Sequence, residues 1–223
     1  MKIIFISDTH TLHGQMLNEI PEGDVLVHCG DVSGRGVGSE IQDFLAWFSS
    51  LPHKNKIFIA GNHDFGFQYR DHVLQKTLES LKERNIHYLE DSGIEIDGVK
   101  FWGSPWTPPF YNWAFMLNED EIKEKWEMIP RDTNVLITHG PPLGILDLVV
   151  YGQENVGCPA LMEEIVKLKD LKVHAFGHIH EEYGTAMGLG ENGPIFINAS
   201  TCTLRYKPWN KPIVIEIGNE EPI

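Results

Sequence analysis

Five short apolar runs in this chain each end abruptly at a carboxylate, an amide or an imidazole side chain. The runs are four to six residues long and rich in β-branched and aromatic residues, which is typical of buried β-strands. The polar residues at their ends are Asp8, His10, Asp31, Asn62, His63, His139, His178 and His180. Because open α/β sheets place their sites beyond the carboxyl ends of the strands, the pattern predicts an α/β fold with one polar site at these ends.

The length and charge of the chain limit its organisation and partners. Its 223 residues fit one domain with a sizeable core, and we expect a single domain over residues 1–223. Asp and Glu outnumber Lys and Arg by 32 to 18, a net charge of −14. Long nucleic acids are bound by basic surfaces, so this balance argues against such a partner. A small phosphate ligand stays compatible, because bound cations create their own local positive field.

The cysteines and apolar stretches favour a cytoplasmic chain without a membrane partner. Three cysteines without a C-x-x-C pair argue against a disulfide scaffold or a zinc ribbon and favour a reducing compartment. The first apolar run ends at Asp8, too early for a signal peptide. No stretch approaches the ~20 apolar residues that span a bilayer.

Strands and helices alternate in the first half of the chain, which predicts βαβ units. One helix is predicted over residues 39–52, with Ser39 and Gln42 at capping-box spacing. A second is predicted over residues 71–84. Its expected inward residues are Val73, Leu74, Leu78 and Leu81.

The later part of the chain predicts a hairpin, an aromatic loop, two helices and two further strands. Asp97-Gly98 is a strong hairpin signal, and residues 104–117 form a loop rich in proline and aromatic residues. Helices are expected after Asn118, which has Glu121 at capping-box spacing, and from Pro159, which suits a first helical position. The expected apolar face of the last helix is Leu161, Met162, Ile165, Val166 and Leu168.

Aspartate, asparagine and histidine side chains together indicate a transition-metal site. Imidazole favours Mn, Fe, Zn or Co, whereas Mg²⁺ prefers oxygen ligands and water. Asp8 and His10, like His178 and His180, are two residues apart and share a face of an extended chain, so each pair can converge. Asp31 lies in flexible backbone, which leaves room for a bridging carboxylate.

Charge balance indicates what such a site would bind. Two divalent ions with the carboxylates of Asp8 and Asp31 would keep about two positive charges, which suits an anionic substrate and a hydroxide. Two ions ~3.5–4 Å apart can clamp a phosphate and lower the pKa of a bridging water. We therefore expect in-line attack of a metal-bridging hydroxide on phosphorus.

One imidazole is left over from the metal ligands. His63 follows Asn62 and is a candidate general acid for the leaving oxygen and a candidate substrate contact. Asp64 either orients His63 as part of the catalytic group or caps the next turn.

Taken in order, the polar blocks resemble a known family. D-x-H, G-D, G-N-H-D, H-G and G-H-x-H between residues 8 and 180 resemble the signature of the calcineurin-like metallophosphoesterases. GSPWTPPF, THGPPLG, HIHEEYGT and INASTCT resemble the MPPED branch of that family. The resemblance implies a four-layer α/β/β/α sandwich of two mixed sheets flanked by helices. It also implies hydrolysis of phosphodiesters, with cyclic nucleotides the best-known substrate class.

The resemblance also implies how the ligands divide between two divalent transition-metal ions, for which we expect manganese, with iron, zinc or cobalt as alternatives. One ion would take Asp8, His10, Asp31 and His180, and the other Asp31, Asn62, His139 and His178. His63 would be the general acid. We therefore predict a binuclear metal-dependent phosphodiesterase acting on a small phosphodiester or nucleotide.

Several alternatives stay open. Arg35 is either a phosphate contact, by likeness to the GDxxDRG motif of phosphoprotein phosphatases, or a solvated turn residue. Gly34 stands where those enzymes have Asp, and this difference counts against a protein phosphatase. Trp106, Phe110 and their aromatic neighbours either stack on a nucleobase or pack the loop against the sheet. The alternative functions are a phosphomonoesterase, including a protein phosphatase, and a nucleotide-binding regulator with a vestigial site. The sequence leaves a monomer and a homodimer open.

Overall fold

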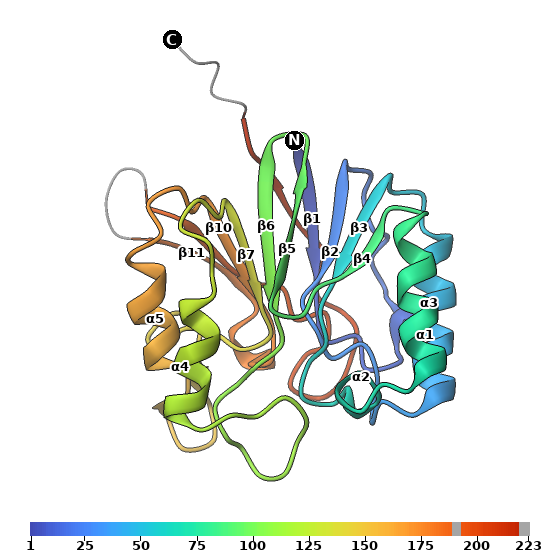
Figure 1. The fold of residues 1–223 in the computed structure, drawn as a ribbon. Helices are drawn as coiled ribbons and strands as arrows, with labels where there is room; N and C mark the ends of the chain where they lie inside the picture. Colours follow the sequence, from blue (N-terminus) through green and yellow to red (C-terminus); the bar gives the residue numbers. More distant parts are fainter. Residues whose placement is uncertain (189–192, 219–223) are drawn as a thin grey trace.

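Two mixed β-sheets lie face to face, and helices cover their outer faces (Figure 1). The computed structural model describes residues 1–188 and 193–218. The strand order is β13-β1-β2-β3-β4 in the first sheet and β11-β12-β10-β7-β6-β5 in the second. In each sheet, an antiparallel strand borders parallel ones. The predicted four-layer α/β/β/α sandwich is confirmed.

Most strands coincide with apolar runs of the sequence, whereas β11 and the β8–β9 hairpin were not expected. The first sheet comprises β1 (Lys2–Ile6), β2 (Val25–His28), β3 (Asn55–Phe58), β4 (Ile86–Tyr88) and β13 (Ile213–Glu216). The second comprises β5 (Ser92–Ile96), β6 (Val99–Ser104), β7 (Val135–Thr138), β10 (Val173–Phe176), β11 (Gly184–Met187) and β12 (Ile195–Asn198). A separate small hairpin pairs β8 (Leu148–Val149) with β9 (Glu154–Asn155).

Helices flank the two sheets on opposite sides. They are α1 (Gly38–Ser50), α2 (Phe65–Gln68), α3 (His72–Lys82), α4 (Glu119–Glu127) and α5 (Pro159–Ile165), with 3₁₀ turns η1 (His13–Gln15) and η2 (His180–Glu182). Helices α1 and α3 lie beside the first sheet, and α4 and α5 beside the second (Figure 1). In the described part of the chain, no helix is long and apolar enough to cross a membrane.

Three apolar clusters hold the layers together. One lies between the sheets, and each of the others joins a sheet to its helices. Strands β1, β2, β7 and β10 are therefore buried on both faces, which explains why their sequences are mostly apolar rather than alternating. Burial on both faces fixes the strands and hence the loops that follow them.

Most local signals of the sequence are confirmed. Asp97 and Gly98 take positive φ values of 47° and 79° in the turn between β5 and β6, as a two-residue hairpin requires. Asn118 accepts a hydrogen bond from the backbone of Glu121 at the start of α4. Pro159 is the first residue of α5.

Three details of the helices were predicted wrongly. The residue preceding α1 at its N-cap is Val37 rather than Ser39, because the carboxylate of Glu40 accepts hydrogen bonds from the backbone preceding the helix. Val73 and Val166 were expected inward but are 69% and 73% exposed. Each lies about 100° around its helix from the neighbouring inward residue, which takes it off the apolar face.

Candidate metal centre

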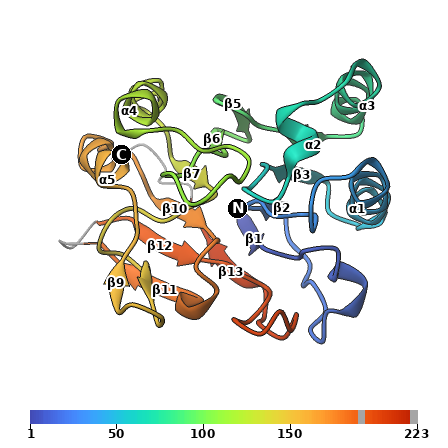
Figure 2. The same ribbon diagram turned by 90° about the horizontal axis from the view of Figure 1, so that it is seen from below.

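The predicted ligands come from five loops that leave the carboxyl ends of β1, β2, β3, β7 and β10. Strand β1 starts at the upper edge of the molecule in Figure 1, so these ends lie at the lower edge, onto which Figure 2 looks. Because β1 to β3 belong to one sheet and β7 and β10 to the other, the ligands meet across the two sheets.

The first group of ligand atoms belongs to Asp8, His10 and His180, which lie within 4.8 Å of one another. Nε2 of His180 lies 3.2 Å from Nε2 of His10 and 3.4 Å from Oδ1 of Asp8. The hydroxyl of Ser200 donates to the other carboxylate oxygen of Asp8 at 3.0 Å. Segments from both ends of the sequence therefore contribute to one cluster.

The second group belongs to Asp31, His139 and His178, again within 4.8 Å of one another. Nε2 of His139 lies 3.4 Å from Oδ1 of Asp31 and 2.9 Å from Oδ1 of Asn62. The other oxygen of Asp31 lies 3.8 Å from Nε2 of His10, a member of the first group. The two oxygens of Asp31 therefore face different groups, which is the arrangement of a bridging carboxylate.

The donor set suits a pair of divalent cations. Asp8 and Asp31 are buried, and within residues 1–188 and 193–218 they form ion pairs only with imidazoles. Buried carboxylates need a compensating charge. Imidazole nitrogens with carboxylate and amide oxygens are ligands for transition-metal ions, so the residues present fit such ions.

The pKa shifts of the cluster residues also indicate that the site would bind positive charge. Burial opposes ionisation of Asp8, but the hydrogen bond and charge of His180, with the charges of His139 and His10, hold its pKa well below the usual range. Burial also opposes protonation of His139, but the charge and hydrogen bond of Asp31 raise its pKa to about 9. The carboxylates therefore retain their negative charge for a cation to neutralise.

Unusual backbone angles bring these ligands together. Asp8, His10, Asp31 and His178 have positive φ values of 50°, 43°, 53° and 70°. Residues other than glycine adopt this region rarely, and such outliers concentrate at functional sites. Gly61 adds a close approach, because a Cβ there would lie 2.2 Å from Oδ1 of Asp31. The loop backbones thus adopt strained conformations that bring the ligand side chains together.

His63 lies against the cluster as a separate imidazole. Its Nδ1 lies 2.8 Å from the carbonyl oxygen of Gly34, and its ring stacks on Trp113 at 4.2 Å with an interplanar angle of 25°. The opposite nitrogen, Nε2, lies 4.0 Å from Oδ2 of Asp31. The ring is therefore held by one nitrogen and one face, with the other nitrogen directed to the metal cluster.

Asp64 does not orient His63, contrary to the catalytic role expected for it. Its carboxylate accepts from the backbone of Gly61 and Val32 and from the backbone and hydroxyl of Ser33, at 2.5–3.1 Å. Burial and the charge of Asp31 raise its pKa to about 7. Asp64 ties the loop after β2 to the loop after β3, because the turn at residues 61–64 directs it inward. Nor does its side chain cap α2.

A cavity of about 200 Å³ opens over the cluster and contains part of the expected substrate contacts. Phe110 and His63 line it, but Trp106 and Arg35 are outside the lining. Of the two roles left open for Trp106, the contacts support packing over substrate binding: its Nε1 donates to Asp91 at 2.9 Å, and Lys125 covers its ring. Arg35 is exposed in the turn before α1.

The sequence reasoning missed Tyr206 as part of the site. Its ring centroid lies 5.0 Å from that of His10 and 5.2 Å from that of His180. Tyr206 lies in the loop between β12 and β13, where no apolar run ends, so the strand-end pattern gave no signal. Leu204 of the same loop and Glu181, which follows His180, also line the cavity and were missed.

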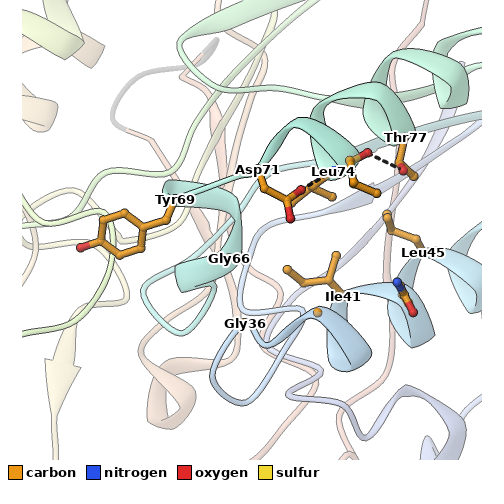
Figure 3. A pocket seen from close by; sticks show the side chains of 11 residues that line it. Gly36, Ile41, Leu45, Gly66, Tyr69, Asp71, Leu74 and Thr77 are labelled. Carbon is orange, nitrogen blue, oxygen red and sulfur yellow. Dashed lines mark hydrogen bonds between the residues drawn. The ribbon is translucent and has the colours of Figure 1, made fainter.

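A separate hollow of about 220 Å³ lies between α1 and the segment from α2 to α3 (Figure 3). Gly36, Gly66, Ile41, Leu45 and Leu74 are among the residues that line it. None of the predicted metal ligands, all of which are in the described part of the chain, lines this hollow. This hollow is therefore separate from the ligand cluster at the strand ends.

Known proteins agree with this geometry. A family model described as calcineurin-like phosphoesterase matches residues 1–182. The chain is 38% identical to the human metallophosphoesterase domain-containing protein 1, over 97% of this chain and 71% of that protein. It is 22% identical to a 3′,5′-cyclic-nucleotide phosphodiesterase of Nostoc sp. (strain PCC 7120), over 73% of this chain and 58% of that protein.

The fold has a counterpart among solved structures. The protein TT1561 of Thermus thermophilus superposes with a TM-score of 0.60 and covers 88% of each chain at 10% sequence identity, which is a likeness of fold. The family model covers most of this chain, and the human relative matches nearly all of it. The chain therefore belongs to the calcineurin-like phosphoesterase family, and it is a metal-dependent phosphoesterase.

Proposed function

We propose that this phosphoesterase is a binuclear phosphodiesterase of small substrates, with cyclic nucleotides as the first candidate class. The observation that carries the proposal is Asp31, whose two oxygens face His139 at 3.4 Å and His10 at 3.8 Å. A carboxylate shared between two ligand groups fits two ions rather than one. Manganese is the first candidate metal, because the imidazole-rich set favours transition metals over magnesium.

The two groups would hold the ions with one shared ligand. Asp8, His10, Asp31 and His180 would bind one ion, and Asp31, Asn62, His139 and His178 the other. When bound, such a pair supplies Lewis acidity toward a phosphate oxygen and an activated water as nucleophile.

His63 would deliver the proton to the leaving oxygen. The carbonyl of Gly34 can only accept, so Nδ1 of His63 carries a hydrogen and Nε2 is the nitrogen that exchanges its proton. Nε2 lies at the edge of the cavity, 4.0 Å from Asp31. Trp113 keeps the ring in this plane by stacking. Proton donation from Nε2 would stabilise the alkoxide that departs from phosphorus.

The charge of the cavity favours a diester over a monoester. A diester carries one negative charge, whereas a monoester dianion carries two and needs additional cationic contacts. Among the described residues, those lining the cavity include no Lys or Arg, and Glu181 adds a carboxylate. Arg35, whose counterpart in phosphoprotein phosphatases grips phosphate, is exposed outside it. The distant Nostoc relative, named as a cyclic-nucleotide phosphodiesterase, supports nucleotides as the class to test first.

A pair of chromogenic substrates tests the proposal. The manganese-loaded protein should hydrolyse bis(p-nitrophenyl) phosphate with a kcat/KM at least about tenfold above that for p-nitrophenyl phosphate. A higher kcat/KM for the monoester would overturn the diesterase proposal. A parallel panel of 2′,3′- and 3′,5′-cyclic nucleotides tests the substrate class, and turnover of the chromogenic diester alone would remove cyclic nucleotides from it.

A further inference from the structure

A second, larger groove opens directly beside the cavity over the metal cluster. Its volume is about 410 Å³, against about 200 Å³ for the cavity itself. Phe110, His178 and Glu181 line both hollows, so the groove continues the cavity. A group attached to a phosphorus at the cluster can therefore extend into it.

Apolar side chains form the two walls of this groove. Pro108, Pro109 and Phe110 of the aromatic loop form one wall, and Val149, Tyr151 and Val156 around the β8–β9 hairpin form the other. Residues 104–117 and this hairpin are far apart in the sequence, and both project beyond the carboxyl ends of the strands (Figure 1). An apolar surface of this kind favours an apolar occupant.

The hairpin wall is fixed by a buried carboxylate. Asp147 is 1% exposed, and its side chain accepts from the backbone of Gly144 and Gly157, each at 2.9 Å. At the hairpin tip, the backbone of Val150 donates to Glu181 at 3.4 Å, which ties the wall to the turn that carries His180. The groove is therefore preformed, and its position relative to the metal cluster is set.

The loop wall is also held in place. Thr107 donates its backbone N–H to Phe115 at 2.9 Å, and the backbone of Phe110 donates to the sulfur of Met116 at 3.1 Å. Consecutive prolines at Pro108 and Pro109 restrict the backbone further. A rigid wall binds an apolar group at a lower entropic cost than a flexible loop does.

The charges of the groove exclude a second anionic group. Glu154 and Glu181 contribute carboxylates, and the lining, within the described residues, contains no Lys or Arg. A second phosphate or a carboxylate on the substrate would meet only like charge here. The groove thus separates diesters with an uncharged second ester group from nucleoside polyphosphates and other polyanions.

A phosphodiester has two ester groups, and the position of the groove relative to the cluster indicates which of them binds in the groove. His178 lines the groove, whereas His63 lines only the cavity. Because His63 is the proposed donor to the leaving oxygen, the leaving group departs on its side. The group that stays on phosphorus then extends past His178 into the groove.

We propose that this groove is the subsite for an uncharged, apolar ester group that remains on phosphorus. The inference rests on the proposed diesterase function and narrows its substrates to diesters carrying one bulky aryl or nucleobase-like group. In the reaction, the oxygen of water bonds to phosphorus, the bond from phosphorus to the leaving oxygen breaks, and that oxygen takes a proton. The products are the phosphomonoester of the apolar alcohol and the alcohol of the leaving group.

Three p-nitrophenyl diesters test the subsite on the full chain loaded with manganese. Their second ester groups are methyl, phenyl and 4-carboxyphenyl, and p-nitrophenolate leaves in each. After correction for their uncatalysed rates, kcat/KM should be at least about tenfold higher for phenyl than for methyl. The 4-carboxyphenyl ester should lose most of that advantage because its charge meets Glu154 and Glu181.

A matched pair of variants localises the effect. Val156→Trp fills the groove and should lower the phenyl-to-methyl ratio about tenfold. Val166→Trp adds the same ring at a 73% exposed position just after α5, outside the lining, and should leave the ratio unchanged. Manganese content and circular dichroism check that both variants fold.

The outcomes separate this inference from the proposed function. Equal kcat/KM for the phenyl and methyl esters in the unmodified protein would overturn the subsite while leaving the diesterase intact. A ratio lowered equally by Val166→Trp and Val156→Trp would also overturn it. Failure to hydrolyse any of the diesters, together with turnover of a monoester, would overturn the proposed function and the subsite with it.

Discussion

Nε2 of His139 lies 3.4 Å from Oδ1 of Asp31, although the two residues follow strands of different sheets. Asp31 follows β2 of the first sheet, and His139 follows β7 of the second. Packing between the sheets therefore sets the distance between ligands of one candidate metal ion. This contact links the stability of the sandwich to the chemistry at its edge.

The shared carboxylate gives the first prediction. Asp31→Asn keeps the shape of the side chain but removes the charge that both ligand groups face, so the bound manganese per chain should fall. Turnover of bis(p-nitrophenyl) phosphate should fall at least about 100-fold, because substitution of residues that only hydrogen-bond to metal ligands already lowers activity by nearly that factor. Asp43→Asn is the control, because that side chain is 68% exposed and pairs with His13 away from the cluster. Full activity and metal content in Asp31→Asn would contradict the bridging role.

His63 is expected to act on the leaving group rather than on metal binding. His63→Gln should retain its manganese, but it should lose about 10²–10⁴-fold in kcat for diphenyl phosphate, whose leaving group needs a proton. The loss for bis(p-nitrophenyl) phosphate should be much smaller, because p-nitrophenolate departs without one. The comparison of the two kcat ratios checks this role. An equal loss for both esters, or loss of metal, would instead indicate that His63 is a ligand, as its position near His10 and Asp31 also permits.

The close approach of Gly61 to Asp31 predicts a steric effect on the site. A Cβ at residue 61 would lie 2.2 Å from Oδ1 and 2.5 Å from the backbone nitrogen of Asp31. Gly61→Ala should therefore displace the carboxylate, lower manganese affinity and cost on the order of 1–3 kcal/mol of unfolding free energy. Gly14→Ala, which meets nothing within 4 Å, should change neither quantity. Metal titration and urea unfolding of both variants measure this, and wild-type affinity in Gly61→Ala would show that the loop can relax.

Much of the site could be predicted because its ligands follow buried strands. A run such as that ending at Thr138 is apolar nearly throughout, so the histidine after it, His139, marks the end of the strand. The order of sheets and the pairing of ligands across them depend on packing over long sequence distances. Those features were supplied by the family resemblance and not by any local pattern.

The errors arose where local pattern competes with tertiary contacts. Asp64 follows His63 in the sequence, but the turn directs its carboxylate to the backbone of Val32 and Ser33. Trp106 belongs to an aromatic loop, but Asp91 and Lys125 hold its ring away from the cavity. Such partners lie far along the chain, so composition alone does not distinguish a packing aromatic residue from a binding one.

A buried histidine outside the metal cluster predicts a pH dependence of stability. His174 is fully buried, its Nε2 lies 2.8 Å from the hydroxyl of Thr138, and burial lowers its pKa to about 3. The unfolded chain takes up this proton below a pH of about 6.5, whereas the folded chain does so only near 3. Above pH 6.5, keeping His174 neutral in the folded protein costs no stability. Below that pH the unfolded chain gains a proton that the folded chain does not, so the unfolding free energy falls as the pH falls toward 3.

Urea unfolding with and without the substitution measures this contribution. The unmodified protein should lose unfolding free energy as the pH falls from about 6.5 to about 5. In metal-free buffer, His174→Gln should make this loss smaller by up to about 2 kcal/mol. Gln can still donate to Thr138, and His72→Gln at an exposed helix position provides the control. The same pH dependence in His174→Gln and in the unmodified protein would show that His174 does not titrate in this way.

Metal stoichiometry and turnover measured on one sample test the central claim most directly. Protein stripped with a chelator and reloaded with manganese should bind about two ions per chain, and hydrolysis of bis(p-nitrophenyl) phosphate should rise with their uptake. Stripped protein should show no turnover above the buffer rate. Full turnover by the stripped protein in metal-free buffer would contradict the account of the five strand ends as a metal centre.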